Sequence, residues 1–528
     1  MMARILILVI CLAYVSTTRA QNDLSADSKK LEIFLKNLDG LYVDSLETRA
    51  LVEVGIRAML EELDPHSIYM NEEQFTAANE PLAGKFNGIG IRYHLIDDTL
   101  TVLEVFEDSP AEKGKLRAGD QLIAIGKDIL SGRGLSANEM SVFIKDEQKA
   151  NQPFTVWRNH GREKLYTKLD RAEVKVSSVP AYFMFDKHTG YIRLDKFSST
   201  SLNDFRSALD ALNEQGMDNL IFDLRGNSGG YLNVAIKIVD EFLDDRKLIV
   251  YTEGLHHSKR ETYATSGGRF LSGDLVVLID ERSASASEIV AGAIQDWDRG
   301  LIVGRRSFGK GLVQRTIEFD DGSAMRLTIS RYYTPSGRSI QKPYDDGVSA
   351  YKRDLSIRME HGEFYSADSI KLSESLVYYT PAKRKVYGGG GIMPDVFVPA
   401  DSIFPNGFVA DMVGRGLDYL VALQLVERHR DQIMTTYPNS TEFNDSYRLA
   451  GQHLLEVKRL LRLRGIEFTD DEFAAQLSEM EKTIKPVVAR FAYGLNDFYM
   501  VNAHYDTSVG RALENVANNT FKELGLNQ

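Results

Sequence analysis

The chain has 528 residues, a formal net charge of −12 and a single cysteine. This length is enough for about three or four domains. Hydrophobic residues make up 43% and charged residues 26% of the sequence, which excludes wholesale disorder and a fibrous class. The acidic balance argues against a dedicated nucleic-acid-binding protein. One cysteine excludes an intrachain disulfide, a cysteine zinc site and a CxxC redox pair.

Residues 1–20 have the pattern of an export signal. Arg4 precedes an apolar run over residues 5–15, and Thr18 and Ala20 supply the small residues of a cleavage site. The run is too short to span a membrane, although a buried N-terminal helix is an alternative. We expect the mature protein to be exported to a bacterial periplasm or cell envelope, without a transmembrane segment. It is also expected to contain no thiol, because Cys11 lies inside the run.

The two ends of the mature chain are predicted to be helical. In residues 21–84, Leu31, Phe34, Leu35 and Leu38 follow helical spacing, and residues 51–63 repeat the pattern. Residues 401–528 show the same helical pattern. Both regions have apolar faces without obvious catalytic residues. Two alternatives follow: these helices pack within the chain, or they join two copies into a homodimer.

The sequence pattern changes at residues 85–170, which are predicted to form a small β-rich module. Its first segment contains Gly88, Ile89, Gly90 and Ile91. Short strands between turns are predicted at residues 101–106, 121–125 and 154–158.

Residues 171–400 alternate between strand and helix patterns. Apolar strands are predicted at residues 191–194, 220–224, 275–279 and 301–304, and helices at residues 203–215, 232–243 and 288–297. This alternation is typical of an α/β domain with buried parallel strands. The predicted fold class is therefore a multidomain α/β protein, with an α/β core, an inserted β-rich module and helical N- and C-terminal regions.

A glycine-rich turn, GNSGG at residues 226–230, follows one of the apolar strands. It matches the G-x-S-x-G pattern of a nucleophile elbow with Ser228 as the nucleophile. A second interpretation is that the turn presents backbone N–H groups at a helix N-terminus, forming an anion or oxyanion pocket. A third is a tight turn without chemistry.

Residues 304–311 nearly match a phosphate-binding P-loop, but the match fails at its last position. Gly311 supplies no hydroxyl for magnesium, and residues 312–319 alternate like a strand where a helix is required. Lys310 then needs another explanation. It is either a surface lysine in a hairpin or a buried base, since burial lowers the pKa of a lysine toward neutrality.

Adjacent histidines, His256 and His257, are interpreted as part of a surface loop. Neighbouring side chains point in different directions, and no nearby His or Glu completes a set of metal ligands. No metal site and no cofactor are expected.

The sequence SASASE at residues 283–288 lies between an apolar strand and a helix. Ser285 with Glu288 three residues later is a capping box. A serine at this place is also where an α/β enzyme presents a nucleophile, with the N–H of Ala286 directed at a developing oxyanion. The pattern by itself does not choose among Ser283, Ser285 and Ser287.

Together, SASASE at 283–288, FGKG at 308–311 and Gln314 resemble the catalytic core of the carboxy-terminal processing proteases, also called tail-specific proteases. Further landmarks of that family follow in order, at residues 64–67, 88–91, 116–120, 223–230, 333–338 and 391–395. The resemblance covers roughly residues 30–400. It extends to residues 85–170, which resemble a PDZ domain, a module that captures a peptide C-terminus on backbone N–H groups.

The resemblance implies specific roles. Ser285 would be the nucleophile, Lys310 the general base and Gln314 the residue that orients the lysine. The oxyanion would be held by the N–H of Ala286 and that of Gly229 or Gly230. Residues Gly88, Ile89, Gly90 and Ile91 would bind the peptide carboxylate.

The predicted function is an exported serine endopeptidase acting on proteins or peptides that it recognises by their free C-terminal tails. Its acyl-enzyme would form on Ser285, and no nucleic acid is expected as a partner. One alternative is a catalytically silent PDZ scaffold or exported chaperone. Another is a Ser-His-Asp hydrolase that uses Ser228.

Overall fold

The computed structural model describes residues 25–145, 152–159, 161–400, 407–518 and 520–526. The export signal expected at residues 1–20 lies outside these ranges. Among the helices of the described ranges, none is both long and apolar enough to cross a membrane.

The α/β core is built around a six-stranded sheet with the order β10-β11-β12-β15-β16-β21. Its strands are β10 (Ala181–Met184), β11 (Thr189–Arg193), β12 (Asn219–Asp223), β15 (Leu275–Ile279), β16 (Leu301–Gly304) and β21 (Val396–Phe397). β10 is antiparallel to β11, and all other neighbours are parallel. The predicted α/β core with buried parallel strands is confirmed.

Helices cover both faces of this sheet. Successive side chains of a strand point to opposite sides, so neighbouring residues of one strand contact different helices. Along β15, Val277 packs in one apolar cluster with α6 (Ser201–Glu214), α7 (Leu232–Asp240) and α8 (Ala286–Asp296). Val276 and Leu278 pack instead in a cluster with the C-terminal helices. The C-terminal region therefore completes the core.

The C-terminal region is helical, as predicted. It consists of α10 (Phe408–Gly414), α11 (Leu417–Thr436), α12 (Ser440–Ser446), α13 (Gly451–Leu463), α14 (Asp470–Ala475), α15 (Leu477–Ala492), α16 (Leu495–Ala503), α17 (Thr507–Ala517) and α18 (Thr520–Glu523). It also contacts the β-rich module. Arg464 forms an ion pair with Asp97 at 2.7 Å, and Arg430 donates a hydrogen bond to the carbonyl of Ala118 at 2.8 Å.

A second, antiparallel sheet lies beside the core. It contains β1 (Ile68–Met70), β13 (Leu248–Gly254), β14 (His257–Tyr263), β17 (Leu312–Glu318) and β18 (Ala324–Tyr333). The strand expected from residues 312–319 is confirmed as β17. The surface loop expected at His256 and His257 is instead a hairpin: both side chains are exposed, but His257 begins β14.

The β-rich module has a sheet of six antiparallel strands with its own apolar core. The strands are β3 (Ile91–Ile96), β4 (Thr99–Val105), β5 (Gln121–Ile125), β6 (Asp128–Ile129), β7 (Pro153–Arg158) and β8 (Glu163–Lys168), with α4 (Pro110–Lys113) and α5 (Ala137–Lys145). A two-stranded ribbon of β2 (Lys85–Gly88) and β9 (Ala172–Lys175) connects it to its surroundings.

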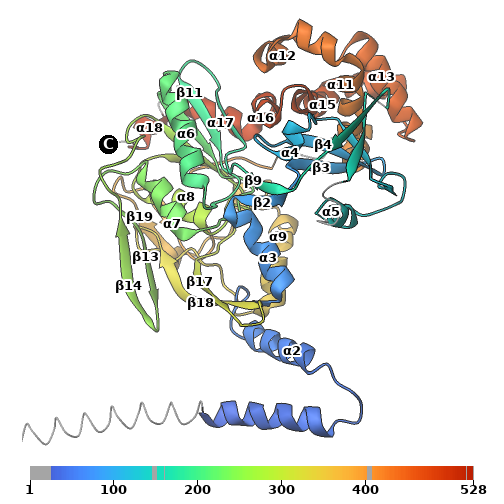
Figure 1. Ribbon diagram of the computed structural model, residues 1–528. Helices are drawn as coiled ribbons and strands as arrows, with labels where there is room; N and C mark the ends of the chain where they lie inside the picture. The colour runs from blue at the N-terminus through green and yellow to red at the C-terminus, as the bar shows by residue number, and fades with distance from the viewer. Residues whose placement is uncertain (1–24, 146–151, 160, 401–406, 519, 527–528) are drawn as a thin grey trace, which may run out of the picture.

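Residues 25–41 form a helix that, with α2 (Thr48–Glu61), extends away from the rest of the molecule in Figure 1. Phe34 on the first of these helices, Val43 between them and Val54 on α2 are exposed apolar side chains. The homodimer through terminal helices stays a prediction. The next helix, α3 (Glu72–Ala83), returns to the core. The described ranges also contain α9 (Gly347–Glu360), β19 (Val377–Tyr379) and β20 (Lys385–Tyr387), with short 3-10 helices at Ala367–Ser369 and Glu374–Leu376.

Candidate active site

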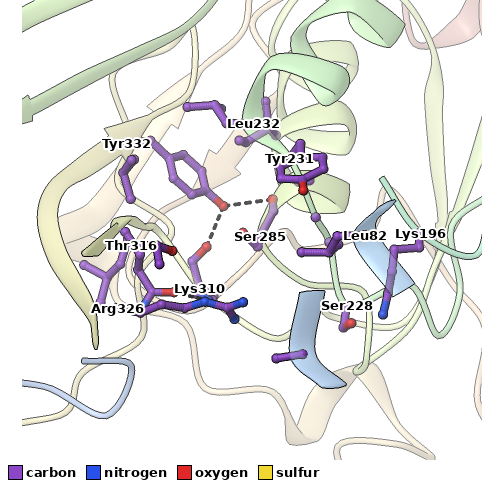
Figure 2. Close-up of a pocket in the computed structure, with 18 of the residues that line it drawn as sticks. Leu82, Lys196, Ser228, Tyr231, Leu232, Ser285, Lys310, Thr316, Arg326 and Tyr332 are labelled. Carbon is purple, nitrogen blue, oxygen red and sulfur yellow. Dashed lines mark hydrogen bonds between the residues drawn. The ribbon is translucent and has the colours of Figure 1, made fainter. Parts of the chain in front are cut away.

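A cavity of about 380 Å³ brings together residues that are far apart in the sequence. Ser285 reaches it from the N-terminus of α8, and Lys310 from the segment between β16 and β17. Gln314 lines it from β17, and Tyr332 from β18. Figure 2 shows Ser285 near the middle of the cavity, with Tyr332 and Lys310 on one side. Ser285, Lys310 and Gln314, which the sequence resemblance grouped, therefore share one cavity.

The structure distinguishes the three serines of the SASASE sequence by burial. Ser283 and Ser287 are fully buried. Their hydroxyls donate to the carbonyls of Leu224 at 2.9 Å and Asn227 at 2.8 Å, respectively. Ser285 is partly exposed and is the serine of this group that lines the cavity. Only its hydroxyl is placed to meet a substrate.

The backbone of Ser285 has an uncommon conformation. Its φ is 56° and its ψ is −109°, immediately before the first residue of α8. A positive φ is rare for a residue that carries a Cβ, and such strain accumulates at functional sites. The sharp change of direction lets the buried strand β15 be followed by a helix while the serine side chain stays at the cavity.

A buried carboxylate joins the serine segment to the lysine segment. Glu288 is fully buried in α8. Its Oε2 accepts the backbone N–H of Ser285 at 2.8 Å and that of Lys310 at 2.9 Å. Its Oε1 accepts the Ser307 hydroxyl at 2.5 Å and the Gly309 N–H at 2.7 Å. The glutamate predicted as part of a capping box also fixes the lysine segment.

Tyr332 adds a second connection between the same two segments. Its hydroxyl is shared between the carbonyl of Lys310, at 2.6 Å, and that of Ser285, at 3.1 Å. The ring is buried, so these contacts are protected from water.

The Lys310 side chain is oriented by Gln314. Lys310 Nζ donates to Gln314 Oε1 at 3.0 Å, and Gln314 Nε2 donates to the carbonyl of His66. Asp64 shapes the turn that presents this carbonyl, because its Oδ1 accepts the N–H groups of His66 and Ser67. Within the described part of the chain, no hydrogen bond joins the Ser285 hydroxyl to Lys310 Nζ.

The surroundings of Lys310 favour its neutral form. Burial lowers the pKa of its ammonium from the ordinary value, and the positive charge of Arg326 lowers it further. The carboxylates of Glu288 and Asp64 act in the opposite direction without reversing the shift. A neutral amine can accept a proton, which an ordinary lysine at neutral pH does not do.

The glycine-rich turn at residues 226–230 lies against the serine segment. A Cβ placed on Gly229 would lie 2.9 Å from the Ala284 carbonyl and 2.9 Å from Ser285 Cβ, so only glycine allows this approach. The N–H of Gly229, however, donates to Asn227 Oδ1 at 2.9 Å. Its expected role as an oxyanion donor is therefore not supported by this structure.

The N–H groups of Gly230 and Ala286 remain as candidates for the oxyanion pocket. Both residues line the cavity, and in the described ranges neither N–H has a hydrogen-bond acceptor. Ser228 lines the cavity too, but no histidine or carboxylate is found among its described lining residues. The Ser-His-Asp alternative on Ser228 thus lacks its base there.

The same turn is anchored to the C-terminal helices by ion pairs. Asp223 is fully buried at the end of β12 and accepts a hydrogen bond from Arg225 Nη2 at 2.6 Å. Arg225 Nη1 lies 2.9 Å from both carboxylate oxygens of Asp506, which caps α17. Because Gly226 follows Arg225 directly, the position of the turn depends on the C-terminal region.

The candidate carboxylate-binding segment is buried in this structure. Gly88 ends β2, Ile91 begins β3, and the carbonyls of Ile89 and Gly90 accept the N–H groups of Ala111 and Phe106. In the described ranges the N–H groups of Ile89 and Gly90 donate to no acceptor. All four residues of the segment, Gly88 to Ile91, are buried.

Comparison with known proteins agrees with this arrangement. Residues 188–350 match the model of peptidase family S41, and residues 408–494 match that of a family of unknown function, DUF8443. The carboxy-terminal-processing protease of Bartonella bacilliformis is 34% identical over 402 residues, which are 75% of this chain and 89% of that protein. The chain therefore belongs to the serine-type peptidases of family S41, among the carboxy-terminal processing proteases.

One further curated protein and one solved structure are less similar in sequence. The carboxy-terminal processing protease CtpB of Bacillus subtilis is 29% identical over 367 residues, covering 68% of this chain and 74% of that protein. Among solved structures, the photosystem II D1 C-terminal processing protease is 24% identical, with a TM-score of 0.36, covering 71% of this chain and 91% of that one.

Proposed function

We propose that this protein is an exported serine endopeptidase that cleaves protein substrates recognised by their C-terminal tails. Ser285 is the nucleophile, Lys310 the general base and Gln314 the residue that orients the lysine. The observation that carries the proposal is the shared cavity, in which a strained, partly exposed serine lies near a lysine of lowered pKa. Membership of the carboxy-terminal processing proteases supports the substrate class.

The reaction proceeds through an acyl-enzyme. Neutral Lys310 takes the proton of the Ser285 hydroxyl while Oγ bonds to the scissile carbonyl carbon. The negative oxygen of the tetrahedral intermediate is held by the N–H groups of Gly230 and Ala286. The C–N bond then breaks, and Lys310 gives its proton to the departing amine. Lys310 then takes a proton from a water molecule while the water oxygen bonds to the ester carbonyl carbon. The C–O bond to Ser285 breaks, the new C-terminus leaves, and Lys310 returns the proton to the Ser285 oxygen.

Gln314 makes this use of a lysine workable. Its Oε1 accepts a hydrogen bond from Nζ at 3.0 Å without adding a negative charge that would keep the amine protonated. The Ser285 hydroxyl must rotate or the lysine must move slightly to form the reactive hydrogen bond, which catalytic groups often complete only with substrate bound.

The organisation proposed for the chain assigns residues 1–20 to a signal peptide and 21–84 to an N-terminal helical region. Residues 85–170 form a PDZ-like domain, 171–400 the protease core and 401–528 the C-terminal helical region. In the PDZ-like domain, the N–H groups of Ile89 and Gly90 are suited to a peptide carboxylate because they have no acceptor in the described ranges. A tail reaches them once the residues that bury them move aside.

The identity of the nucleophile is tested by comparing Ser285→Ala with Ser228→Ala. We expect Ser285→Ala to abolish cleavage and Ser228→Ala to retain it. Each purified protein is incubated with the exported proteome, and new C-termini are mapped by mass spectrometry. Wild-type-specific C-termini that persist with Ser285→Ala would refute the assignment. If these C-termini disappear with Ser228→Ala but persist with Ser285→Ala, the Ser-His-Asp alternative is favoured.

Tail recognition is tested on a substrate protein that the wild type cleaves. We expect amidation of its C-terminus to reduce kcat/KM by about tenfold, since the backbone N–H groups then lose their anionic partner. A short internal peptide with the same scissile bond is the control and is expected to show a much smaller effect. Equal rates for the free and amidated substrate would exclude carboxylate capture.

A further inference from the structure

The catalytic cavity has a charge that contrasts with the rest of the chain. Among the described residues that line it, Lys196, Lys310 and Arg326 are basic and none is acidic. The whole chain, by comparison, carries a formal net charge of −12. Because Lys310 must be neutral to act as a base, a bound peptide meets the charges of Lys196 and Arg326. A cleft lined by one sign of charge concentrates ligands of the other sign.

Of these two cations, Lys196 has the fewer hydrogen-bond and ion-pair partners. Arg326 Nη2 donates to Asn79 Oδ1 at 3.1 Å. The Lys196 ammonium, which is partly buried, forms no ion pair or hydrogen bond with any described residue. The carboxylate of the neighbouring Asp195 forms its ion pair with Arg193 Nε instead, at 2.9 Å.

Lys196 lies along the path that a peptide bound at Ser285 would follow. It lines the catalytic cavity and also an adjoining cavity of about 550 Å³, and Ser228 lines both. In the view of Figure 2, Lys196 lies on the other side of Ser285 from Lys310 and Arg326. Its backbone is fixed, because the Ser201 hydroxyl donates to the Lys196 carbonyl at 2.9 Å. A peptide extending from Ser285 into the adjoining cavity passes this ammonium.

We propose that Lys196 forms a carboxylate-binding subsite beside the nucleophile, which selects peptides carrying an acidic group close to the scissile bond. This inference rests on the proposed peptidase function. A partly buried ammonium gains more from a charge-assisted hydrogen bond to a carboxylate than from a neutral amide. The carboxylate comes either from an Asp or Glu side chain or from the α-carboxylate of a short tail.

The test uses a peptide that the wild-type full-length enzyme cleaves in a Ser285-dependent manner. Each position within about three residues of the scissile bond is occupied in turn by Glu or by Gln, with a free or an amidated C-terminus. The wild type is expected to prefer Glu over Gln at one position by about fivefold in kcat/KM. This preference should shrink in 0.5 M salt, because screening weakens partly exposed ion pairs.

The substitution Lys196→Glu is expected to reverse the preference, so that Gln, and still more Lys, is favoured at the same position. Lys237→Glu is the matched control. It changes the net charge by the same amount on the exposed side of α7, outside the cavity. It should keep the wild-type preference. If a free C-terminus rather than a side chain is the ligand, Lys196→Glu removes the difference between free and amidated short peptides instead.

A binding measurement separates the subsite from catalysis. Fluorescence anisotropy of the Glu and Gln peptides on Ser285→Ala, with and without Lys196→Glu, should show the same reversal in Kd. An unchanged preference in Lys196→Glu, or an equal change in Lys237→Glu, overturns the subsite and leaves the peptidase intact. Cleavage that persists at the wild-type rate in Ser285→Ala overturns the proposed function, and the subsite with it.

Discussion

Replacing Lys310 by alanine is expected to lower kcat/KM on a cleavable peptide by at least about a thousandfold. The Ser285 hydroxyl loses its only base, because no histidine or carboxylate is found among the described residues that line the cavity. Ser285→Ala should cause a loss of the same size, and the double variant should be no worse, since the two residues act as one unit. Thermal unfolding of each variant shows whether the fold is retained.

Lys310→Arg provides the control for charge and length. An arginine stays protonated at every accessible pH, so it cannot accept the serine proton and should not restore activity. Near-normal turnover of either Lys310 variant would eliminate the proposed dyad, whatever the outcome with Ser285.

The pH dependence of the same activity follows from the surroundings of Lys310. The base works only when neutral, so kcat/KM should rise as pH passes upward through its lowered pKa. Arg326→Gln removes a positive charge that lowers this pKa, and the rise should therefore move to higher pH. Arg326→Lys keeps the charge and should leave it nearer the wild-type position. A rise that does not move in Arg326→Gln would show that another group controls the profile.

The second large effect is expected from Glu288→Gln. The carboxylate accepts four hydrogen bonds, from Ser285, Ser307, Gly309 and Lys310. A glutamine of nearly the same volume keeps only one acceptor oxygen and turns an NH₂ group toward buried donors. An unpaired buried donor costs about 1–3 kcal/mol. We expect a loss of about 3 kcal/mol in the free energy of unfolding and a fall of about a hundredfold in kcat.

Urea denaturation and steady-state kinetics on the same preparation measure these two quantities. Glu514→Gln is the matched control, because this glutamate also lies in a helix, α17, but is exposed and forms an ion pair with Arg511 at 2.7 Å. Its loss should cost about 1 kcal/mol or less and leave kcat close to that of the wild type. If Glu288→Gln behaves like Glu514→Gln, the carboxylate does not position the two catalytic segments.

The sequence pattern correctly predicted the elements that carry local signals. Apolar strands at residues 220–224, 275–279 and 301–304 correspond to β12, β15 and β16. The helix expected at 288–297 begins at Ala286, because the strained Ser285 serves as its N-cap. Such elements are predictable because hydrophobic periodicity reports which face of a segment is buried.

The choice among Ser283, Ser285 and Ser287 was not decided by the residues themselves. Only the resemblance to the carboxy-terminal processing proteases selected Ser285. The structure gives a physical reason, since the other two hydroxyls are buried and bonded to backbone carbonyls. Burial depends on what packs against a segment, which neighbouring residues in the chain do not show.

Several contacts of the site had no recognisable signal. The antiparallel pairing of β17 and β18 brings Arg326 into the cavity that Lys310 lines, and no motif of the sequence marked Arg326. Asp506 reaches the glycine-rich turn through Arg225, across 281 residues. The oxyanion role expected of Gly229 or Gly230 stays a prediction, and the sequence did not show that the Gly229 N–H donates to the side chain of Asn227.

The sequence by itself determined the class of protein, the spacing of serine, lysine and glutamine, and the alternation of strands and helices. These features depend on short-range patterns that the chain carries whether or not it is folded. The tertiary structure decided which serine meets the cavity and why Lys310 holds its proton weakly. It also decided that the C-terminal helices close the second face of the central sheet. Those features depend on burial and on charges brought together by folding, and both arise only from contacts between distant segments.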